Sequence, residues 1–244
     1  MKSLTLIAAA LFAATPLLAQ QPATKPKADT AKAHQAGMNH DMSGMKGMNH
    51  DDPDHVVQGG GTLPEGWSAR TDRDAPVSNV KFVAMGDGVH ATMGPAAIFY
   101  RSADKVHAPF HAVASFTQTK APMHPEAYGL FFGGKALDGA GQQYTYFLVR
   151  GDGKFLIKQR NGAETKNVTD GWSANAAVKS QDESGKDTNK LEIDATTPGK
   201  VKFLVNGTSV YEMDASAADV NGIVGLRINH NLDVHVGGFG VHQR

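Results

Sequence analysis

The stretch "YTYFLVRGDGKFLIKQR", residues 144–160, decides the fold class of this chain. Two runs rich in aromatic and aliphatic residues, 144–150 and 154–160, flank the tripeptide Gly-Asp-Gly. Short apolar runs around such a turn are typical of a β-hairpin, in which glycine supplies the positive φ that the turn needs. The stretch therefore predicts two antiparallel strands joined by a tight turn.

Alternation along the first of these strands divides its side chains between two faces. One face suits a hydrophobic core and carries Thr145, Phe147 and Val149. The other face consists of Tyr144, Tyr146, Leu148 and Arg150, and thus carries two phenols and a guanidinium. Two interpretations of the second face remain open: a partly open surface that meets a ligand, or tyrosines that cover a half-buried sheet.

Similar runs, separated by turn residues, continue from Thr62 toward the C-terminus and predict about a dozen strands. The expected strands include 80–85, 89–93, 96–101, 110–118, 189–196, 201–207, 209–214, 222–228 and 233–241, with a further strand that begins at Tyr128. The only helical signal is a single turn within residues 214–220. This spacing of strands and turns predicts an all-β sandwich or jelly roll.

Three stretches carry a resemblance to a known superfamily: "YTYFLVRGDGKFLIKQRNG", "NKLEIDATTPGKVKFLVNGTSVYEMD" and "GIVGLRINHNLDVHVGGFGV". In this order they resemble the concanavalin A-like lectin/glucanase jelly rolls, most closely the laminin-G-like and keto-disaccharide-hydrolase-like domains that bacteria secrete. The resemblance covers residues 62–244 and implies a jelly-roll β-sandwich. It does not select an activity, because this fold hosts lectins, glycosidases and adaptors alike.

Glucanases of this superfamily place their catalytic carboxylates on one strand in the pattern E-x-D-x-x-E. Here Glu192 and Asp194 match the first two positions, but Thr197 occupies the third. Retaining hydrolysis needs two carboxyl groups that flank the scissile bond, so we do not assign the catalytic roles. We expect Leu191 and Ile193 to face the core, with both carboxylates facing water.

A proline-rich segment, "APMHPEAYG", leads into the strand that begins at Tyr128. His124 and Glu126, two residues apart, could act as an acid/base pair or as metal ligands. The alternative is a structural hydrogen bond, which is the more common role of such a pair. The candidate ligand-binding residues are His124, Glu126, Tyr128, Tyr144, Tyr146 and Arg150.

The first residues are typical of a secretory signal peptide, residues 1–19, because Lys2 precedes an apolar run that ends in small residues. This run is shorter than the roughly 20 residues of a membrane-spanning helix. The chain has no cysteine, so we expect neither a lipoprotein anchor nor a disulfide. We therefore expect a periplasmic or secreted protein without a stable membrane anchor. The formal net charge of +0 gives no indication of a nucleic-acid partner.

Residues 20–61 are expected to form a disordered linker, because they contain no aromatic residue apart from histidine and few bulky aliphatic residues. Within it, "GMNHDMSGMKGMNHDD", residues 37–52, repeats the pentapeptide Gly-Met-Asn-His-Asp. Thioether and imidazole groups suit copper, and the segment resembles the Met/His-rich tracts of periplasmic copper-resistance proteins. The candidate metal ligands are His34, Met38, His40, Met42, Met45, Met48, His50 and His55. The alternative is a low-complexity spacer whose methionines are incidental or act as oxidant sinks.

Three hypotheses of function follow. The first is an exported binding protein whose non-catalytic jelly roll recognises a carbohydrate-related ligand. The second is a periplasmic copper-handling protein that uses the Met/His-rich tract. The third is a glycoside-hydrolase-like enzyme that uses His124 and Glu126, which the incomplete glucanase motif disfavours.

Overall fold

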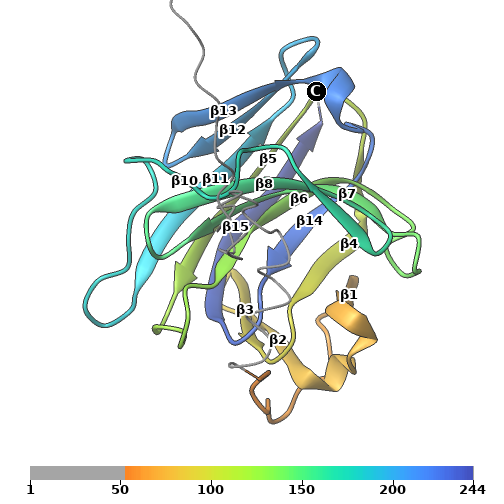
Figure 1. Cartoon of the computed structure of the whole chain (residues 1–244). Coiled ribbons are helices and arrows are strands. Elements are labelled where there is room, and N and C mark those ends of the chain that lie inside the picture. The colour runs from red at the N-terminus through yellow and green to blue at the C-terminus, as the bar shows by residue number, and fades with distance from the viewer. Residues whose placement is uncertain (1–52, 244) are drawn as a thin grey trace, which may run out of the picture. The chain divides into compact units, whose positions relative to one another are not determined.

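The computed structural model describes residues 53–243, which form two antiparallel β-sheets stacked face to face (Figure 1). Sheet A has eight strands, in the order β1-β4-β14-β6-β7-β8-β10, with β9 paired to β8. Sheet B has seven strands, in the order β13-β12-β11-β5-β15-β3-β2. Neighbouring strands of each sheet come from distant parts of the sequence, as a jelly roll requires.

The bounds of the strands follow the runs of alternating side chains. Sheet A contains β1 (Trp67–Thr71), β4 (Ala97–Val106), β6 (Ala127–Lys135), β7 (Gln143–Arg150), β8 (Lys154–Asn161), β9 (Glu164–Asn167), β10 (Ser173–Ala174) and β14 (Gly222–Ile228). Sheet B contains β2 (Val80–Met85), β3 (Gly88–Met93), β5 (Phe110–Gln118), β11 (Asp187–Asp194), β12 (Lys200–Val205), β13 (Thr208–Asp214) and β15 (Asp233–Gln243). Three short 3-10 turns complete the described elements: η1 (Asp72–Asp74), η2 (Val77–Asn79) and η3 (Ala215–Ala217). No helix within residues 53–243 has the length and apolar character needed to cross a membrane.

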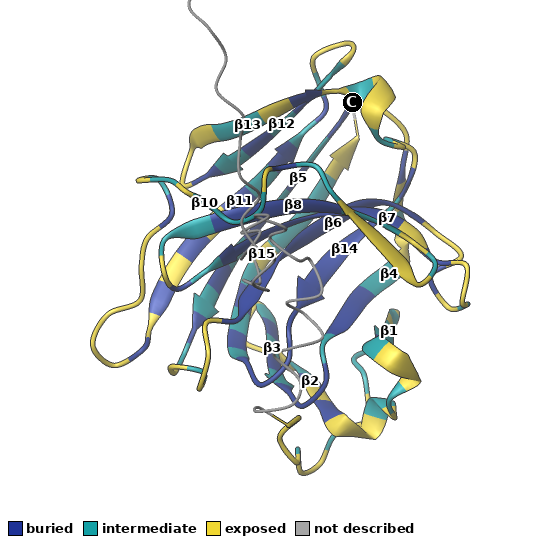
Figure 2. Ribbon diagram, in the orientation of Figure 1, coloured by how far each residue is buried: buried dark blue, intermediate teal, exposed yellow. Residues whose placement is uncertain are grey.

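The hydrophobic core lies between the two sheets and is built from the inward-facing residues of each strand. Phe147 of β7 is fully buried and its ring packs edge-on against that of Phe203 of β12, with 5.3 Å between the ring centroids. Leu191 and Ile193 of β11 are also fully buried, as their alternation predicts. Figure 2 shows buried residues along the strands of both sheets and exposed residues mainly in the connecting turns.

The hairpin that the sequence predicts at residues 144–160 is confirmed as β7 and β8, with Arg150 opposite Lys154. Its three-residue loop places Gly153 at a φ of +78°, and the Gly153 amide donates to the Arg150 carbonyl at 3.1 Å. This left-handed conformation is strained for a residue with a Cβ atom, which explains why the loop uses glycine.

The structure confirms the predicted fold class, an all-β jelly-roll sandwich. The strands that the pattern does not predict are β1, β9 and β10, which are short or lie at the edges of sheet A. Residues 53–61 of the expected linker are hydrogen-bonded to the sandwich, since the Gly61 amide donates to the Val80 carbonyl at 3.1 Å. The structured part thus begins before the predicted boundary at Thr62. The expected signal peptide lies outside the described residues.

Candidate ligand-binding site

The two tyrosines of the β7 strand lie on the outer face of sheet A, the face turned away from sheet B. The predicted division of this strand is confirmed, because Phe147 and Val149 belong to the core between the sheets, whereas Tyr144, Tyr146 and Leu148 do not. The outer face carries its own small hydrophobic cluster, formed by Ile98, Ala127, Phe131, Leu137, Tyr144, Tyr146 and Leu148.

Close ring contacts hold this outer cluster together. The ring centroids of Tyr144 and Tyr146 are 5.6 Å apart, and that of Phe131 lies 5.1 Å from Tyr144. Gly225 on β14 makes room for Phe131, because a Cβ atom there would come within 2.6 Å of the Phe131 ring. The tyrosine rings are therefore fixed by packing rather than free to rotate.

Positively charged side chains surround these rings. The hairpin register places Lys158 opposite Tyr146 and Arg160 opposite Tyr144. A third cation, Arg227 of β14, has its guanidinium 6.0 Å from the centroid of the Tyr146 ring. One carboxylate, Asp72 of η1, accompanies them. We call the set Tyr144, Tyr146, Lys158, Arg160, Arg227 and Asp72 the basic tyrosine cluster.

Asp72 forms a bidentate ion pair with Arg227. The two terminal guanidinium nitrogens of Arg227 donate to the two Asp72 oxygens at 2.8 and 2.6 Å. Arg160 approaches the same carboxylate, with 3.6 Å between nitrogen and oxygen. Burial opposes ionisation of Asp72, but these two arginines overcome it and lower the pKa of its carboxyl. Burial alone would also lower the pKa of Arg227, and Asp72 and the phenols raise it instead.

Lys158 has no such partner. Only 1% of this residue is exposed, and within residues 53–243 its ammonium makes no ion pair or hydrogen bond. Burial, and then the nearby Arg227 and Arg160, lower the pKa of the Lys158 ammonium. The Nε atom of Arg227 is likewise buried without a hydrogen-bond acceptor. The basic tyrosine cluster thus contains hydrogen-bond donors that have no acceptor within it, and its positive charges outnumber its negative ones.

Of the two interpretations of the face that carries Tyr144 and Tyr146, the partly open surface is wrong. These residues are only 4% and 3% exposed, because aromatic rings and the stems of long cationic side chains pack on one another across the outer face. Burial raises the pKa of both phenols, so they stay protonated and remain able to donate hydrogen bonds. A ligand reaches them only if neighbouring side chains move aside.

The prediction that Tyr128 shares a surface with these tyrosines is also wrong. Tyr128 points to the opposite face of sheet A, where its ring lies 5.2 Å from that of Phe116 in the core. Its hydroxyl donates to Asp187 and accepts from the Asn189 amide at 3.1 Å. Tyr128 is the second residue of β6, and its position along the strand places it inward.

His124 and Glu126 do not form the expected pair. His124 is exposed, whereas Glu126 is only 4% exposed and lies 2.8 Å from Nε2 of His230. The Asn229 amide donates to the other Glu126 oxygen at 3.1 Å, and Nδ1 of His230 lies 3.2 Å from Asp54. His230, in the turn between β14 and β15, therefore links Glu126 to the start of the described chain, and the interactions of Glu126 are structural.

Arg150 lies at the hairpin end of the outer face. Its guanidinium bonds to both oxygens of Asp152 at 2.7 Å and lies 4.3 Å from the centroid of the Trp172 ring. These contacts satisfy the side chain, so Arg150 holds the 168–174 segment in place beside the cluster.

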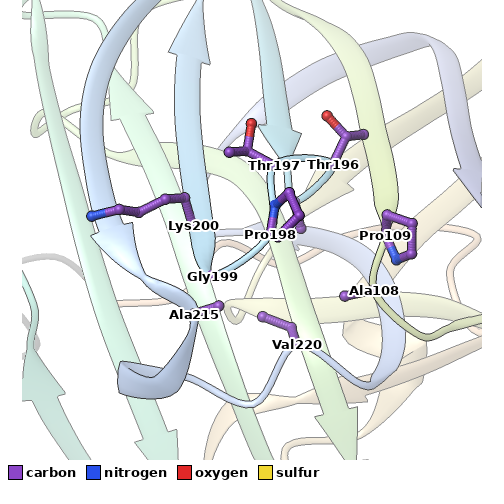
Figure 3. Close-up of a pocket in the computed structure, with 10 residues that line it drawn as sticks. Ala108, Pro109, Thr196, Thr197, Pro198, Gly199, Lys200, Ala215 and Val220 are labelled. Carbon is purple, nitrogen blue, oxygen red and sulfur yellow. The ribbon is translucent and has the colours of Figure 1, made fainter.

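The glucanase-like carboxylates lie on the other sheet. Glu192 and Asp194 project from the outer face of sheet B, and Glu192 is 2.9 Å from Nε2 of His111. Thr197, at the position of the missing glutamate, lines a shallow pocket of about 250 Å³ (Figure 3). Its wall is otherwise formed mainly by small and apolar residues, Ala108, Pro109, Ala195, Thr196, Pro198, Gly199, Ala215 and Val220, together with Lys200. The ammonium of Lys200 is paired with Asp214, so the pocket offers no free charged group.

The candidate metal ligands cannot be compared with the structure except for His55. The other seven, His34, Met38, His40, Met42, Met45, Met48 and His50, lie outside the described residues. The backbone amide of His55 donates to the Asn231 side chain at 2.7 Å, and its side chain is exposed. In the part of the chain from 53 to 243, no group of three or more His, Asp or Glu side chains is arranged to hold a metal ion.

Sequence reasoning identified the two tyrosines but missed the four charged members of the cluster. Lys158 and Arg160 could have been found, because a hairpin that closes at residues 151–153 sets their register against Tyr146 and Tyr144. Asp72 and Arg227 carry no such signal, since they are 155 residues apart and meet only through strand order.

No protein-family model and no curated protein matches this chain. Among solved structures, the chain is similar to the carbohydrate binding module CBM66 from Bacillus subtilis, with a TM-score of 0.56 and 11% identity over 75% of this chain and 99% of that one. Sheep galectin-11 matches with a TM-score of 0.42 and 11% identity, over 65% of this chain and 99% of that one. The carbohydrate recognition domain of Emp47p matches with a TM-score of 0.46 and 8% identity, over 78% and 93%. The likeness to the first of these supports the fold alone, and the described chain is a β-sandwich of two antiparallel sheets.

Proposed function

We propose that this chain is an exported, non-catalytic carbohydrate-binding protein whose ligand occupies the basic tyrosine cluster. The observation that carries the proposal is the gathering of two phenols and three cationic side chains on the face of sheet A that does not form the core. The fold, similar to that of a carbohydrate-binding module, supports the proposal.

The chemistry of the cluster suits a sugar. Once neighbouring side chains move aside, the aromatic rings provide apolar faces with a polar tip, onto which the C–H face of a sugar ring can pack. Guanidinium, ammonium and phenol groups donate the few directed hydrogen bonds that orient a ligand with many oxygen atoms. Packing fixes the tyrosine rings, so the rearrangement that binding requires falls on the long cationic side chains beside them.

The arrangement of carboxylates argues against glycoside hydrolysis. The single carboxylate of the cluster, Asp72, is held in its ionised form by Arg227 and Arg160, whereas a general acid needs a raised pKa. Glu126 is engaged by His230 and Asn229. The proposal is therefore binding without bond cleavage.

A glycan array with the full exported chain tests the proposal. Tyr144→Phe combined with Tyr146→Phe keeps both rings and removes both hydroxyls, and we expect it to lower the signal at least about tenfold. Tyr211→Phe, on sheet B, is the matched control and should bind like the wild type. Binding that survives in the double variant would place the site elsewhere, and an array without any bound glycan would overturn the proposal.

A further inference from the structure

We propose that the ligand of the basic tyrosine cluster carries an anionic group, which Lys158 and Arg227 bind. The inference rests on the proposed function: for a carbohydrate ligand, the anionic group is a carboxylate or a sulfate on the sugar. The basis is an excess of positive charge and of hydrogen-bond donors that the described residues leave without partners.

Several charged side chains on and around this outer face form ion pairs. Arg70 donates to Asp74 at 2.7 Å, and Asp152 is bound by both Arg150 and Lys154. Within the cluster, Asp72 is the only carboxylate for three cations, and Arg227 and Arg160 occupy it. Lys158 remains as the cation that has no anion among residues 53–243.

The burial of Lys158 makes this unusual. An exposed lysine needs no partner because water solvates its ammonium, but only 1% of Lys158 is exposed, so its ammonium has lost much of that solvation. Burying an ion without a partner costs several kcal/mol, and lysine is almost never fully buried unless it is paired. An anion of the ligand would supply the missing partner in a site where little water weakens the attraction.

Arg227 offers a second unpaired donor in the same cluster. Its two terminal nitrogens are held by Asp72, which fixes the guanidinium plane, while its Nε–H is buried with no acceptor. The protonated phenols of Tyr144 and Tyr146 add two donors nearby. A cluster with unpaired cationic donors complements a group that accepts hydrogen bonds and carries negative charge, and carboxylate and sulfate are such groups.

Calorimetric titration of the full chain tests the inference with matched pairs of probes. The carboxylate pair is tri-galacturonic acid and its neutral methyl ester, and the sulfate pair is a sulfated galactose trisaccharide and its desulfated form. Inorganic sulfate alone is the fifth probe. The protein variants are Lys158→Met, which removes the unpaired cation, and Lys154→Met, which makes the same change on the same strand at an ion-paired lysine.

We expect at least one acidic saccharide to bind about tenfold more tightly than its neutral partner, and whichever pair shows the difference identifies the anion. Lys158→Met should abolish this difference, and Lys154→Met should keep it. Equal binding of the acidic and neutral forms would overturn the inference while leaving the proposed carbohydrate binding intact. If inorganic sulfate binds to the wild type but not to Lys158→Met, and no saccharide binds, the result supports the anion site and contradicts the proposed carbohydrate binding. If none of the five probes binds, both are overturned.

Discussion

Replacing Lys158 with methionine should stabilise this protein, although lysine-to-methionine changes on a surface have little effect. Methionine retains most of the methylene stem that packs beside Tyr146 in the hairpin register, and it lacks the buried ammonium. The change therefore removes an unpaired ion that also lies near two arginines, Arg227 and Arg160. Apolar replacement of a buried ion is favourable when the ion has no compensating partner.

The expected gain follows from the burial of the residue. Only 1% of the residue is exposed, so the ammonium of Lys158 bears a substantial part of the desolvation penalty. Replacing buried ionic groups with well-packed apolar residues raises stability by about 1–4 kcal/mol in favourable cases, so we expect about 1–3 kcal/mol here. With a urea m-value of about 2 kcal/mol/M, the unfolding midpoint should rise by about 0.5–1.5 M.

Urea unfolding at neutral pH, without ligand, measures this shift. Lys154→Met is the control, because Lys154 is on the same strand, has 38% of its side chain exposed and lies 3.1 Å from Asp152. We expect that variant to stay within about 0.5 kcal/mol of the wild type. A destabilised Lys158→Met protein would refute the reasoning, because it would mean that the ammonium has a favourable partner in the ligand-free protein.

The pH dependence gives a second test of the same reasoning. The folded-state pKa of Lys158 lies below the ordinary value of 10.5, so in the interval between the two values the unfolded chain binds more protons than the folded chain. The stability of the wild type relative to Lys158→Met should therefore rise with pH across that interval. If the difference in unfolding free energy between wild type and Lys158→Met stayed constant across that pH interval, the result would contradict the burial of a charged amine.

Three further predictions concern other parts of the chain. Glu126 and Asp54 raise the pKa of His230, so their stabilisation is fully present below the ordinary histidine pKa of 6.5 and is lost as the pH rises through the raised value. Thermal unfolding should thus show the advantage of wild type over His230→Gln shrinking above that pH, and a constant advantage would contradict it. Phe147→Ala should lose about 3–5 kcal/mol in chemical denaturation, because Phe147 is fully buried in the core, and a loss below about 1 kcal/mol would be inconsistent with that packing. Changing the methionines of residues 37–52 to leucine and the histidines to alanine should abolish Cu(I) binding in a competitive titration without moving the urea midpoint, whereas unchanged stoichiometry would refute the copper hypothesis.

The sequence determined which segments become strands and which side chains enter the core. Alternation in residues 144–150 was enough to separate Phe147 and Val149 from Tyr144 and Tyr146, because a strand sends successive side chains to opposite faces whatever its neighbours are. The same rule placed Leu191 and Ile193 in the core. The rule also holds along β6, where Tyr128 faces the core with Leu130 and Phe132, but the sequence-based prediction grouped Tyr128 with the ligand-binding candidates.

Only the tertiary structure decided what lies beside those tyrosines. Strand order in sheet A places β14 beside β6 and one strand away from β7, and through it Arg227 meets both Tyr146 and Asp72. Local periodicity contains no information about such pairings, because they depend on how whole strands assemble. The burial of Lys158 also depends on the tertiary structure. The sequence shows a lysine at position 158, but its loss of water, and hence the demand for an anion, arises only once the outer face of the sheet is packed.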